Sequence, residues 1–249
     1  MPGGGWVAES VHLLDEALRS GVGIRAVICS EPAWPALRER FEGRSPPPVK
    51  IVAPDLFAGL ASTETTQGVL TIVEPPLWRM DDLFRPPALV VALDGVRDPG
   101  NAGTMTRSAE ALGATGIVYL KGTVSPANPK TLRASAGSLF RLPFLAGIDA
   151  ETCAAECRQR RVAIFSASPA AGDDPRSADL SQPSMLVFGS ESRGVSAALT
   201  SASRPLRIAT GGVESLNVSA AAAIMLYEAS RQRGTRDGNS RKASGRAGR

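Results

Sequence analysis

Histidine and cysteine are scarce in this 249-residue chain, which contains one histidine and three cysteines. Cys29, Cys153 and Cys157 are too few for a disulfide framework, and with His12 they lack the ligand spacing of a zinc site. We therefore expect no metal and interpret the cysteines as buried apolar residues. Because His12 lies in a helical segment and is interpreted as a surface residue, hydrolases built on a Ser–His or Cys–His pair are disfavoured.

Long apolar runs are missing as well. No segment approaches the roughly 18–20 residues of a membrane helix, and the first ten residues, MPGGGWVAES, lack the layout of a signal peptide. An apolar content of 43% with 21% charged residues is typical of a soluble globular protein. The sequence therefore predicts no membrane partner and a cytoplasmic location.

The net charge of +4 is concentrated at the C-terminus. Residues 231–249, RQRGTRDGNSRKASGRAGR, hold seven Lys or Arg residues and one Asp, so the rest of the chain is slightly acidic. Such a composition buries little apolar area, and we expect a basic disordered tail over 234–249. The tail either adds salt-sensitive affinity for nucleic acid or only keeps the protein soluble. The sequence leaves both alternatives open.

Short alternating elements divide the chain into two α/β units. In the first unit, residues 1–75, the apolar spacing predicts a helix over 6–20 followed by a strand at 24–30, and further helices and strands complete it. A proline-rich linker at 76–87 separates it from the second unit, residues 88–233. In that unit strands and helices alternate, which predicts a mostly parallel sheet with helices on both faces. The predicted fold class is α/β.

The stretch DGVRDPGNAGTMTRSAEALG, residues 94–113, joins a glycine-containing turn to the start of a helix. Its glycine spacing fits neither the dinucleotide fingerprint nor a phosphate loop. What remains is Asn101 as the expected helix cap, Gly103 as a point of close approach, and Arg107 on the same helix face. Arg107 is either a phosphate-binding residue or an ordinary surface arginine.

Two later stretches also place glycines and small polar residues at strand ends. MLVFGSESRGVS, residues 185–196, is a buried strand that runs into glycines around Glu191, as in the ligand crevices of parallel sheets. Glu191 is alternatively a helix-capping partner. PLRIATGGVESLNVSAAAAIMLYEA, residues 205–229, ends a strand in two glycines and begins a helix in which Asn217 and Ser219 need a local role.

In this order, NAGTMTR, FGSESRGVS and VESLNVSAAAAIMLYEA resemble the three motifs of the SpoU/TrmH family. Members of this family are S-adenosylmethionine-dependent RNA ribose 2′-O-methyltransferases of the SPOUT class. The resemblance covers residues 90–232. The stretches VHLLDEALRSGVGIRAVICSE and TTQGVLTIVE are similar to the family's RNA-binding domain, which has a ribosomal-protein-like fold, although Glu9 stands where relatives often have glycine.

The resemblance implies a fold and a cofactor that composition does not reveal. The second domain would form a deep trefoil knot, a rare exception to unknotted connections, and would associate as a homodimer. Residues 219–223 would lie on the crowded helix of the knot. S-adenosylmethionine would be held, chiefly through backbone groups, by Gly189, Ile208 and Leu216.

The resemblance also assigns the reaction to particular side chains. Arg107 would be the main catalytic residue, and the residues that shape the site and orient it or the ribose would be Asn101, Glu191, Ser215 and Asn217. Since a guanidinium is effectively always protonated, we favour phosphate binding and alkoxide stabilisation over proton abstraction for Arg107.

Arg133 falls where some antibiotic-resistance relatives carry a further arginine. It is either an RNA phosphate contact or an ordinary surface arginine. The N-terminal unit favours 23S rRNA as substrate, because it resembles a ribosomal-type RNA binder. A tRNA substrate, a resistance methyltransferase and a non-catalytic RNA-binding relative stay open, whereas the glycine spacing disfavours an unrelated nucleotide-binding enzyme.

Overall fold

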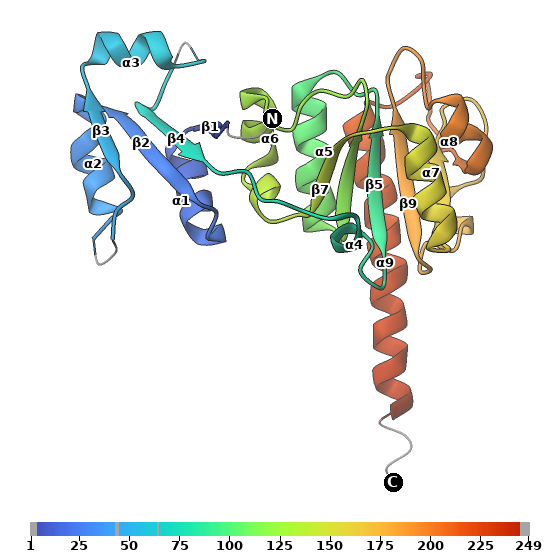
Figure 1. Cartoon of the computed structure of the whole chain (residues 1–249). Helices are drawn as coiled ribbons and strands as arrows, with labels where there is room; N and C mark the ends of the chain where they lie inside the picture. Colours follow the sequence, from blue (N-terminus) through green and yellow to red (C-terminus); the bar gives the residue numbers. More distant parts are fainter. Residues whose placement is uncertain (1–3, 43–44, 64, 245–249) are drawn as a thin grey trace.

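The computed structural model describes residues 4–42, 45–63 and 65–244, which form two α/β domains (Figure 1). The N-terminal domain has a four-stranded sheet in the order β1-β4-β2-β3. Strand β4 runs antiparallel to both β1 and β2, and β3 runs parallel to β2. Its elements are β1 (Trp6–Glu9), α1 (Val11–Ser20), β2 (Ile24–Ser30), η1 (Glu31–Ala33), α2 (Trp34–Glu39), β3 (Val49–Val52), α3 (Pro54–Leu60) and β4 (Val69–Val73).

The prediction of one helix over residues 6–20 is wrong for its first turn. Residues 6–9 form β1, in which Trp6 pairs with Val73 of β4. Helix α1 begins only after Ser10, whose side chain accepts a hydrogen bond from the Leu13 amide. Pairing with a strand about 60 residues away in the sequence overrides the local helical periodicity, which is a weak preference compared with tertiary contacts.

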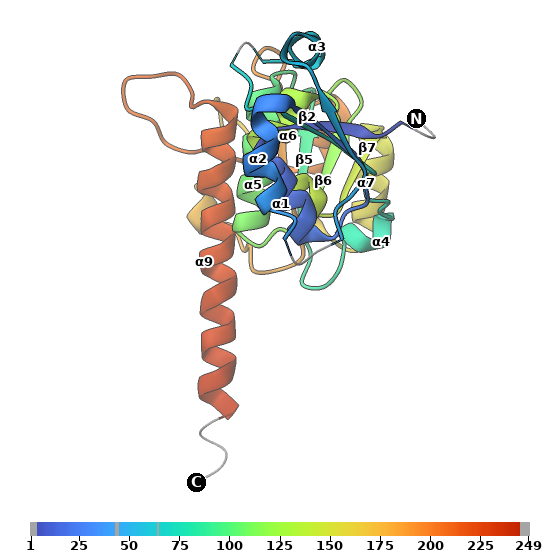
Figure 2. The same cartoon turned by 90° about the vertical axis from the view of Figure 1, so that its left-hand side faces the viewer.

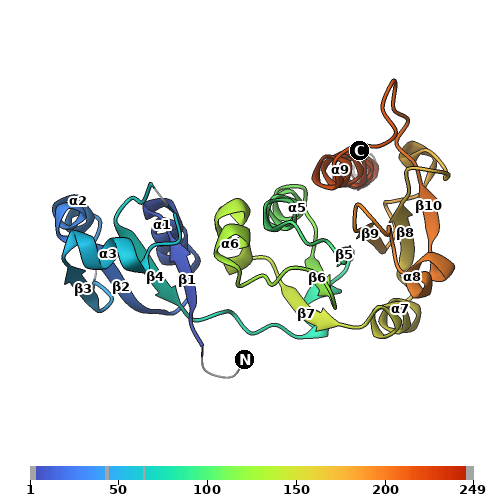
Figure 3. The same ribbon diagram turned by 90° about the horizontal axis from the view of Figure 1, so that it is seen from above.

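The C-terminal domain has a six-stranded, fully parallel sheet in the order β10-β8-β9-β5-β6-β7. Helices α5, α6 and α9 cover one face and α7 and α8 cover the other (Figure 3). The elements are α4 (Met80–Leu83), β5 (Leu89–Asp94), α5 (Pro99–Ala111), β6 (Gly116–Leu120), α6 (Pro129–Ser135), η2 (Ser138–Phe140), β7 (Phe144–Ile148), α7 (Ala150–Gln159), β8 (Ala163–Ala167), η3 (Pro175–Ser177), β9 (Ser184–Gly189), α8 (Ala197–Ala202), β10 (Arg204–Leu206) and α9 (Val218–Ser244).

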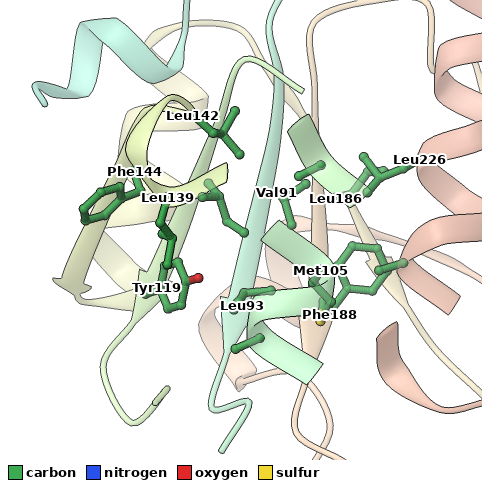
Figure 4. Close-up of a cluster of buried hydrophobic side chains, with 14 of the residues drawn as sticks. Val91, Leu93, Met105, Tyr119, Leu139, Leu142, Phe144, Leu186, Phe188 and Leu226 are labelled. Carbon is green, nitrogen blue, oxygen red and sulfur yellow. The ribbon is translucent and has the colours of Figure 1, made fainter. Parts of the chain in front are cut away.

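The central strand β5 contributes side chains to the hydrophobic core on both faces of the sheet. Val91 and Leu93 point toward α5 and α9, where they meet Met105 and Leu226 (Figure 4). The intervening residues, such as Ala92, face α7 and α8. A strand that is buried on both faces has a continuous apolar sequence. This is why residues 88–93, ALVVAL, show no alternation of apolar and polar residues. The three cysteines are buried, as predicted.

Two segments differ from the sequence prediction. The linker at 76–87 contains α4, whose Leu83 is fully buried against the C-terminal domain. The sequence predicts a disordered tail over 234–249, whereas α9 is helical to Ser244 and extends well beyond the sheet (Figure 2). Once a packed segment has nucleated a helix, each further residue adds a hydrogen bond at little cost. Residues 245–249 lie outside the described part of the chain.

None of the helices in the described part of the chain is long and apolar enough to cross a membrane.

Candidate functional site

One residue from each of the three sequence motifs joins a continuous polar chain. The side-chain Nδ2 of Asn101 donates to Glu191 Oε1 at 2.9 Å, and the side-chain Nδ2 of Asn217 donates to Asn101 Oδ1 at 3.1 Å. Asn217 Oδ1 in turn accepts from Ser219 Oγ at 2.6 Å and from the Ser219 amide at the start of α9. Residues separated by up to 116 positions are thereby fixed relative to one another.

Parallel strands explain why these residues meet. Asp94 at the end of β5 is paired with Gly189 at the end of β9, so the loops that follow both strands emerge at the same edge of the sheet. Loops at the carboxyl ends of adjacent parallel strands form the usual ligand crevice of such sheets. Asp94 also accepts a hydrogen bond from the Ser196 amide at 2.7 Å, which holds the loop carrying Glu191 against β5.

The predicted helix cap at Asn101 is wrong. Asp98 is the N-cap of α5, and its Oδ1 accepts from the Asn101 amide at 2.6 Å. Pro99 occupies the first turn, where its missing N–H costs nothing. Because Asp98 takes the capping role, the Asn101 side chain is left to bridge Glu191 and Asn217.

Gly189 allows the loop after β9 to fold back on itself. Ser190 and Gly194 form a small antiparallel bridge with hydrogen bonds of 2.8 and 3.2 Å. A Cβ on Gly189 would lie 2.1 Å from the carbonyl carbon of Gly194, far closer than any side chain tolerates. Any other residue at position 189 therefore displaces this loop.

A cavity of about 830 Å³, open to solvent, lies between this loop and the start of α9. Gly189, Ile208 and Leu216, which the resemblance assigns to the methyl donor, all line it, and so does Ser215. The other lining residues are Ala167–Pro169, Ser190, Glu191, Gly194, Thr210, Glu214, Val218, Ala221 and Met225.

A second cavity of about 500 Å³ adjoins the first. The two share Gly189, Ser190, Glu191 and Val218, and the second adds Asn101 and the exposed Arg97 from the turn before α5. Glu191 thus stands where the two cavities meet. The two cavities therefore adjoin at a junction lined by polar groups.

The two candidate arginines lie outside both cavities. Arg107 is exposed on α5 and makes no hydrogen bond or ion pair with any residue that the structure describes. Arg133, the candidate RNA contact, instead donates to Glu9 of the N-terminal domain. Within residues 4–42, 45–63 and 65–244, no cluster of His, Cys, Asp or Glu could hold a metal ion.

Three further residues of this region were not predicted from the sequence: Asp94, Arg97 and Asp98. Asp94 is the last residue of a strand in a parallel sheet, a position that favours ligand or loop contacts. Asp98 precedes a proline at the start of a helix, which is a recognisable capping signal. Arg97 carries no local signal, because only the folded loop brings it to the second cavity.

Comparison with known proteins decides the family. Residues 88–227, more than half of the chain, match the sequence profile of the SpoU rRNA Methylase family. This chain belongs to the SpoU rRNA methylase family. The family that the three motifs predict is confirmed, and so is the α/β fold class, because the similar solved structures are SpoU methyltransferases.

The similarity extends over both domains. An uncharacterized tRNA/rRNA methyltransferase of Synechocystis is 33% identical over 234 residues, which are 90% of this chain and 83% of the relative. RlmP of Bacillus subtilis, a 23S rRNA (guanosine(2553)-2′-O)-methyltransferase, is 29% identical and covers 89% of this chain and 87% of its own. The crystal structure of the SpoU methyltransferase AviRb from Streptomyces viridochromogenes with the cofactor AdoMet superimposes with a TM-score of 0.84 at 29% identity, covering 92% of this chain and 91% of AviRb.

Proposed function

We propose that this protein transfers the methyl group of S-adenosylmethionine to a ribose 2′-hydroxyl of 23S rRNA in the cytoplasm. The observation that carries the proposal is the pair of adjoining cavities, which meet at the polar chain formed by the three family motifs. The enzyme class and methyl donor that the sequence predicts are those of the family. Similarity over both domains to RlmP of Bacillus subtilis, a 23S rRNA methyltransferase, supports rRNA as the substrate.

The larger cavity suits S-adenosylmethionine. Gly189, Ile208 and Leu216 would hold it through backbone groups and apolar contacts, since an adenine ring needs a flat apolar slot and a few amide partners. No acidic residue for the ribose follows the second strand, which matches the failed dinucleotide fingerprint. When bound, S-adenosylmethionine supplies an electrophilic methyl group on its sulfonium.

The smaller cavity suits the acceptor nucleotide. Asn101 and Glu191 would orient the ribose, because their side chains are already fixed by mutual hydrogen bonding and need no rearrangement. Arg97, which lines this cavity, would attract the phosphate. Ser215 and Asn217 would hold the loop before α9 in place.

We further propose a homodimer through the exposed face of α5 and α9. Ile224 and Tyr227 of α9 are 44% and 62% exposed, and large apolar side chains grouped on one helix face favour a protein partner. Arg107 is exposed on α5, which packs against α9. An arginine that lines neither cavity of its own chain would then act on the acceptor phosphate at the site of the second copy.

The hydrogen bonding around β10 supports the trefoil knot that the family resemblance implies. Leu206 pairs with Ala167 of β8 on one side and with Asp173 on the other. The chain therefore passes between β8 and the segment that follows it before it reaches α9. Threading of this kind requires small residues nearby, in agreement with Ala220–Ala223 at the start of α9.

Methylation with radiolabelled S-adenosylmethionine tests the function. We expect label in unmethylated 23S rRNA transcripts but not in tRNA, with one stop in primer extension. Incorporation of the labelled methyl group into tRNA alone would contradict 23S rRNA as the substrate. No incorporation into either RNA would favour a non-catalytic RNA-binding protein. Arg107→Ala should abolish methylation while leaving S-adenosylmethionine binding within about twofold, and full turnover would remove Arg107 from the catalytic set.

Mixed dimers test whether Arg107 acts at the site of the second copy. Arg107→Ala and Asn101→Ala should each be inactive alone. Co-refolded mixtures should regain up to about a quarter of wild-type activity, because half of the dimers are mixed and each of these has one intact site. No recovery, with mixed dimers present by mass, would contradict action across the interface.

The role of the basic C-terminal segment, residues 234–249, is a separate question. Deleting residues 234–249 should lower RNA affinity more at low salt than at high salt if the positive charges contact phosphates. Equal affinity at all salt concentrations would leave only the solubilising role.

A further inference from the structure

Two glutamates of the N-terminal domain are buried against the C-terminal domain. Glu9 and Glu16 are only 3% and 7% exposed. Carboxylates are rarely buried unless a cation and hydrogen bonds compensate for the lost water. Each carboxylate is paired with an arginine of the C-terminal domain, and Glu16 also pairs with Arg19 of its own helix at 2.8 Å. The contact between the domains is therefore ionic as well as apolar.

The first pair joins β1 to α6. Glu9 Oε2 accepts from Arg133 Nη1 at 3.2 Å and from the Ser62 amide at 3.1 Å, and Glu9 Oε1 accepts from Thr63 Oγ1 at 2.5 Å. Arg133 Nη1 also donates to Ser62 Oγ at 3.0 Å. Burial raises the pKa of Glu9, but the hydrogen bonds from Ser62 and Thr63, with Arg133, outweigh it and hold the pKa below its ordinary value.

The second contact links α1 to α5 through Arg141, which bonds one glutamate on each helix. Arg141 Nη1 donates to Glu16 Oε2 at 2.5 Å, while its Nε and Nη2 form a two-point contact with Glu110 at 2.6 and 3.0 Å. A Cβ on Gly137 would lie 2.6 Å from the Cβ of Glu16, so the backbones approach as closely as glycine allows. Glu110 lies near the end of α5, the helix whose first turn carries Asn101. The N-terminal domain is thereby bonded to the helix of the candidate site.

These contacts supply directionality that the apolar part of the interface lacks. Trp6 of β1 packs on Phe144 with ring centroids 5.4 Å apart, and the burial of apolar surface by itself is non-directional. Arginine–carboxylate pairs have a fixed geometry and contribute little net stability once desolvation is counted. Their main effect here is therefore on the relative position of the two domains.

We propose that Arg133 and Arg141 are positioning residues that hold the N-terminal domain at one place relative to α5, so that RNA bound by that domain presents a single ribose to the active site. This inference rests on the proposed function. It gives Arg133 a role through Glu9 rather than through an RNA phosphate. Loosening either pair should weaken the selection of the target nucleotide and leave the methyl-donor cavity unchanged.

The test uses Arg133→Met, Arg141→Met, Glu9→Gln and Glu16→Gln in the full chain. For each variant we expect the KM for 23S rRNA to rise about tenfold and additional stops to appear in primer extension. The kcat at saturating RNA and the affinity for S-adenosylmethionine should stay within about twofold. Arg160→Met is the matched control, because Arg160 is similarly exposed and ion-paired, with Asp81 and Glu156, but within the C-terminal domain.

The glutamate variants separate positioning from RNA contact. If Arg133 bound a phosphate, Arg133→Met would raise the KM for RNA, while Glu9→Gln would leave it unchanged or lower it by freeing the guanidinium. That pattern would overturn the proposal. Equal effects of both changes, with thermal unfolding still cooperative, would support it.

A distance measurement keeps the proposal separate from the enzymatic assignment. Spin labels at Leu56→Cys in α3 and Glu151→Cys in α7 report on the two domains, because both positions are exposed and the three native cysteines are buried. We expect one narrow distance distribution in the otherwise wild-type chain and a broad one after Arg141→Met. A narrow distribution in both would overturn the positioning role. If the wild-type protein fails to methylate rRNA, and Arg141→Met still broadens the distance distribution as expected, only the proposed function is overturned.

Discussion

Replacing Gly189 by alanine tests whether the fold of the loop after β9 sets the affinity for the methyl donor. The added Cβ would lie 2.1 to 2.3 Å from backbone atoms of Gly194 and Val195, where ordinary contacts are 3.4 Å or more. The loop must move by more than 1 Å, because the atoms it meets are backbone and cannot rotate away. Overpacking of this kind costs about 1–3 kcal/mol.

The cost should appear in binding rather than in folding. Residues 191–194 are exposed, so the loop can move outward without opening the core. At about 1.4 kcal/mol for each tenfold change, the affinity for S-adenosylmethionine should fall about 5- to 150-fold, while Tm changes by no more than a few degrees.

Isothermal titration with S-adenosylmethionine and a thermal melt of the same sample measure both effects. Gly59→Ala in α3 is the control, since no atom lies within 4 Å of its added Cβ. An affinity within twofold of wild type for Gly189→Ala would refute the reasoning, because the loop would then not determine the shape of the cavity.

Three further predictions concern stability and reactivity. Because the folded-state pKa of Glu9 is lowered, its ionised form stabilises the fold above about pH 4.5, and this contribution is lost as the pH falls below that value. In urea titrations, the wild type should therefore lose more unfolding free energy between pH 7 and 3 than Glu9→Gln does. An equal loss in both proteins would contradict this. Tyr119→Phe removes a buried 2.5 Å hydrogen bond with Thr106 and should lower the unfolding free energy by about 1 kcal/mol in urea, whereas an unchanged value would mean that the bond makes no net contribution. A hydrogen bond with Cys153 and burial raise the pKa of the Cys157 thiol, and both cysteines are buried. A thiol-specific reagent at pH 8 should therefore label Cys153 and Cys157 only after unfolding. Rapid labelling of the native protein would contradict this and would show that α7 separates from the sheet.

The sequence was most informative where a residue's role depends on its near neighbours. The apolar runs of β5 and β9 predict buried parallel strands, since residues buried on both faces need no alternation. The motif residues Asn101, Glu191 and Asn217 stand out because polar residues beside glycines at strand ends and helix starts have few other uses. Family membership follows from their order along the chain.

The predictions from local sequence were wrong where two capping residues lie close together, and where a distant strand pairs with the segment. Asn101 and Asp98 are both good capping residues, and the position of Pro99 decides in favour of Asp98. Residues 6–9 fit a helix by spacing, but β4 offers them a sheet edge. A short segment of sequence around residues 6–9 does not contain β4, whose hydrogen bonds determine that these residues form a strand.

The sequence by itself determined the fold class, the family and the chemical types present at the site. Only the tertiary structure decided which groups meet: that Asn101 bonds Glu191 across 90 positions, that Arg97 reaches the second cavity, and that Arg133 faces Glu9 across 124 positions. The physical reason is that propensity and periodicity act within about one turn of helix or one strand. Charged side chains instead find partners wherever folding removes them from water, and those partners are set by how the domains pack.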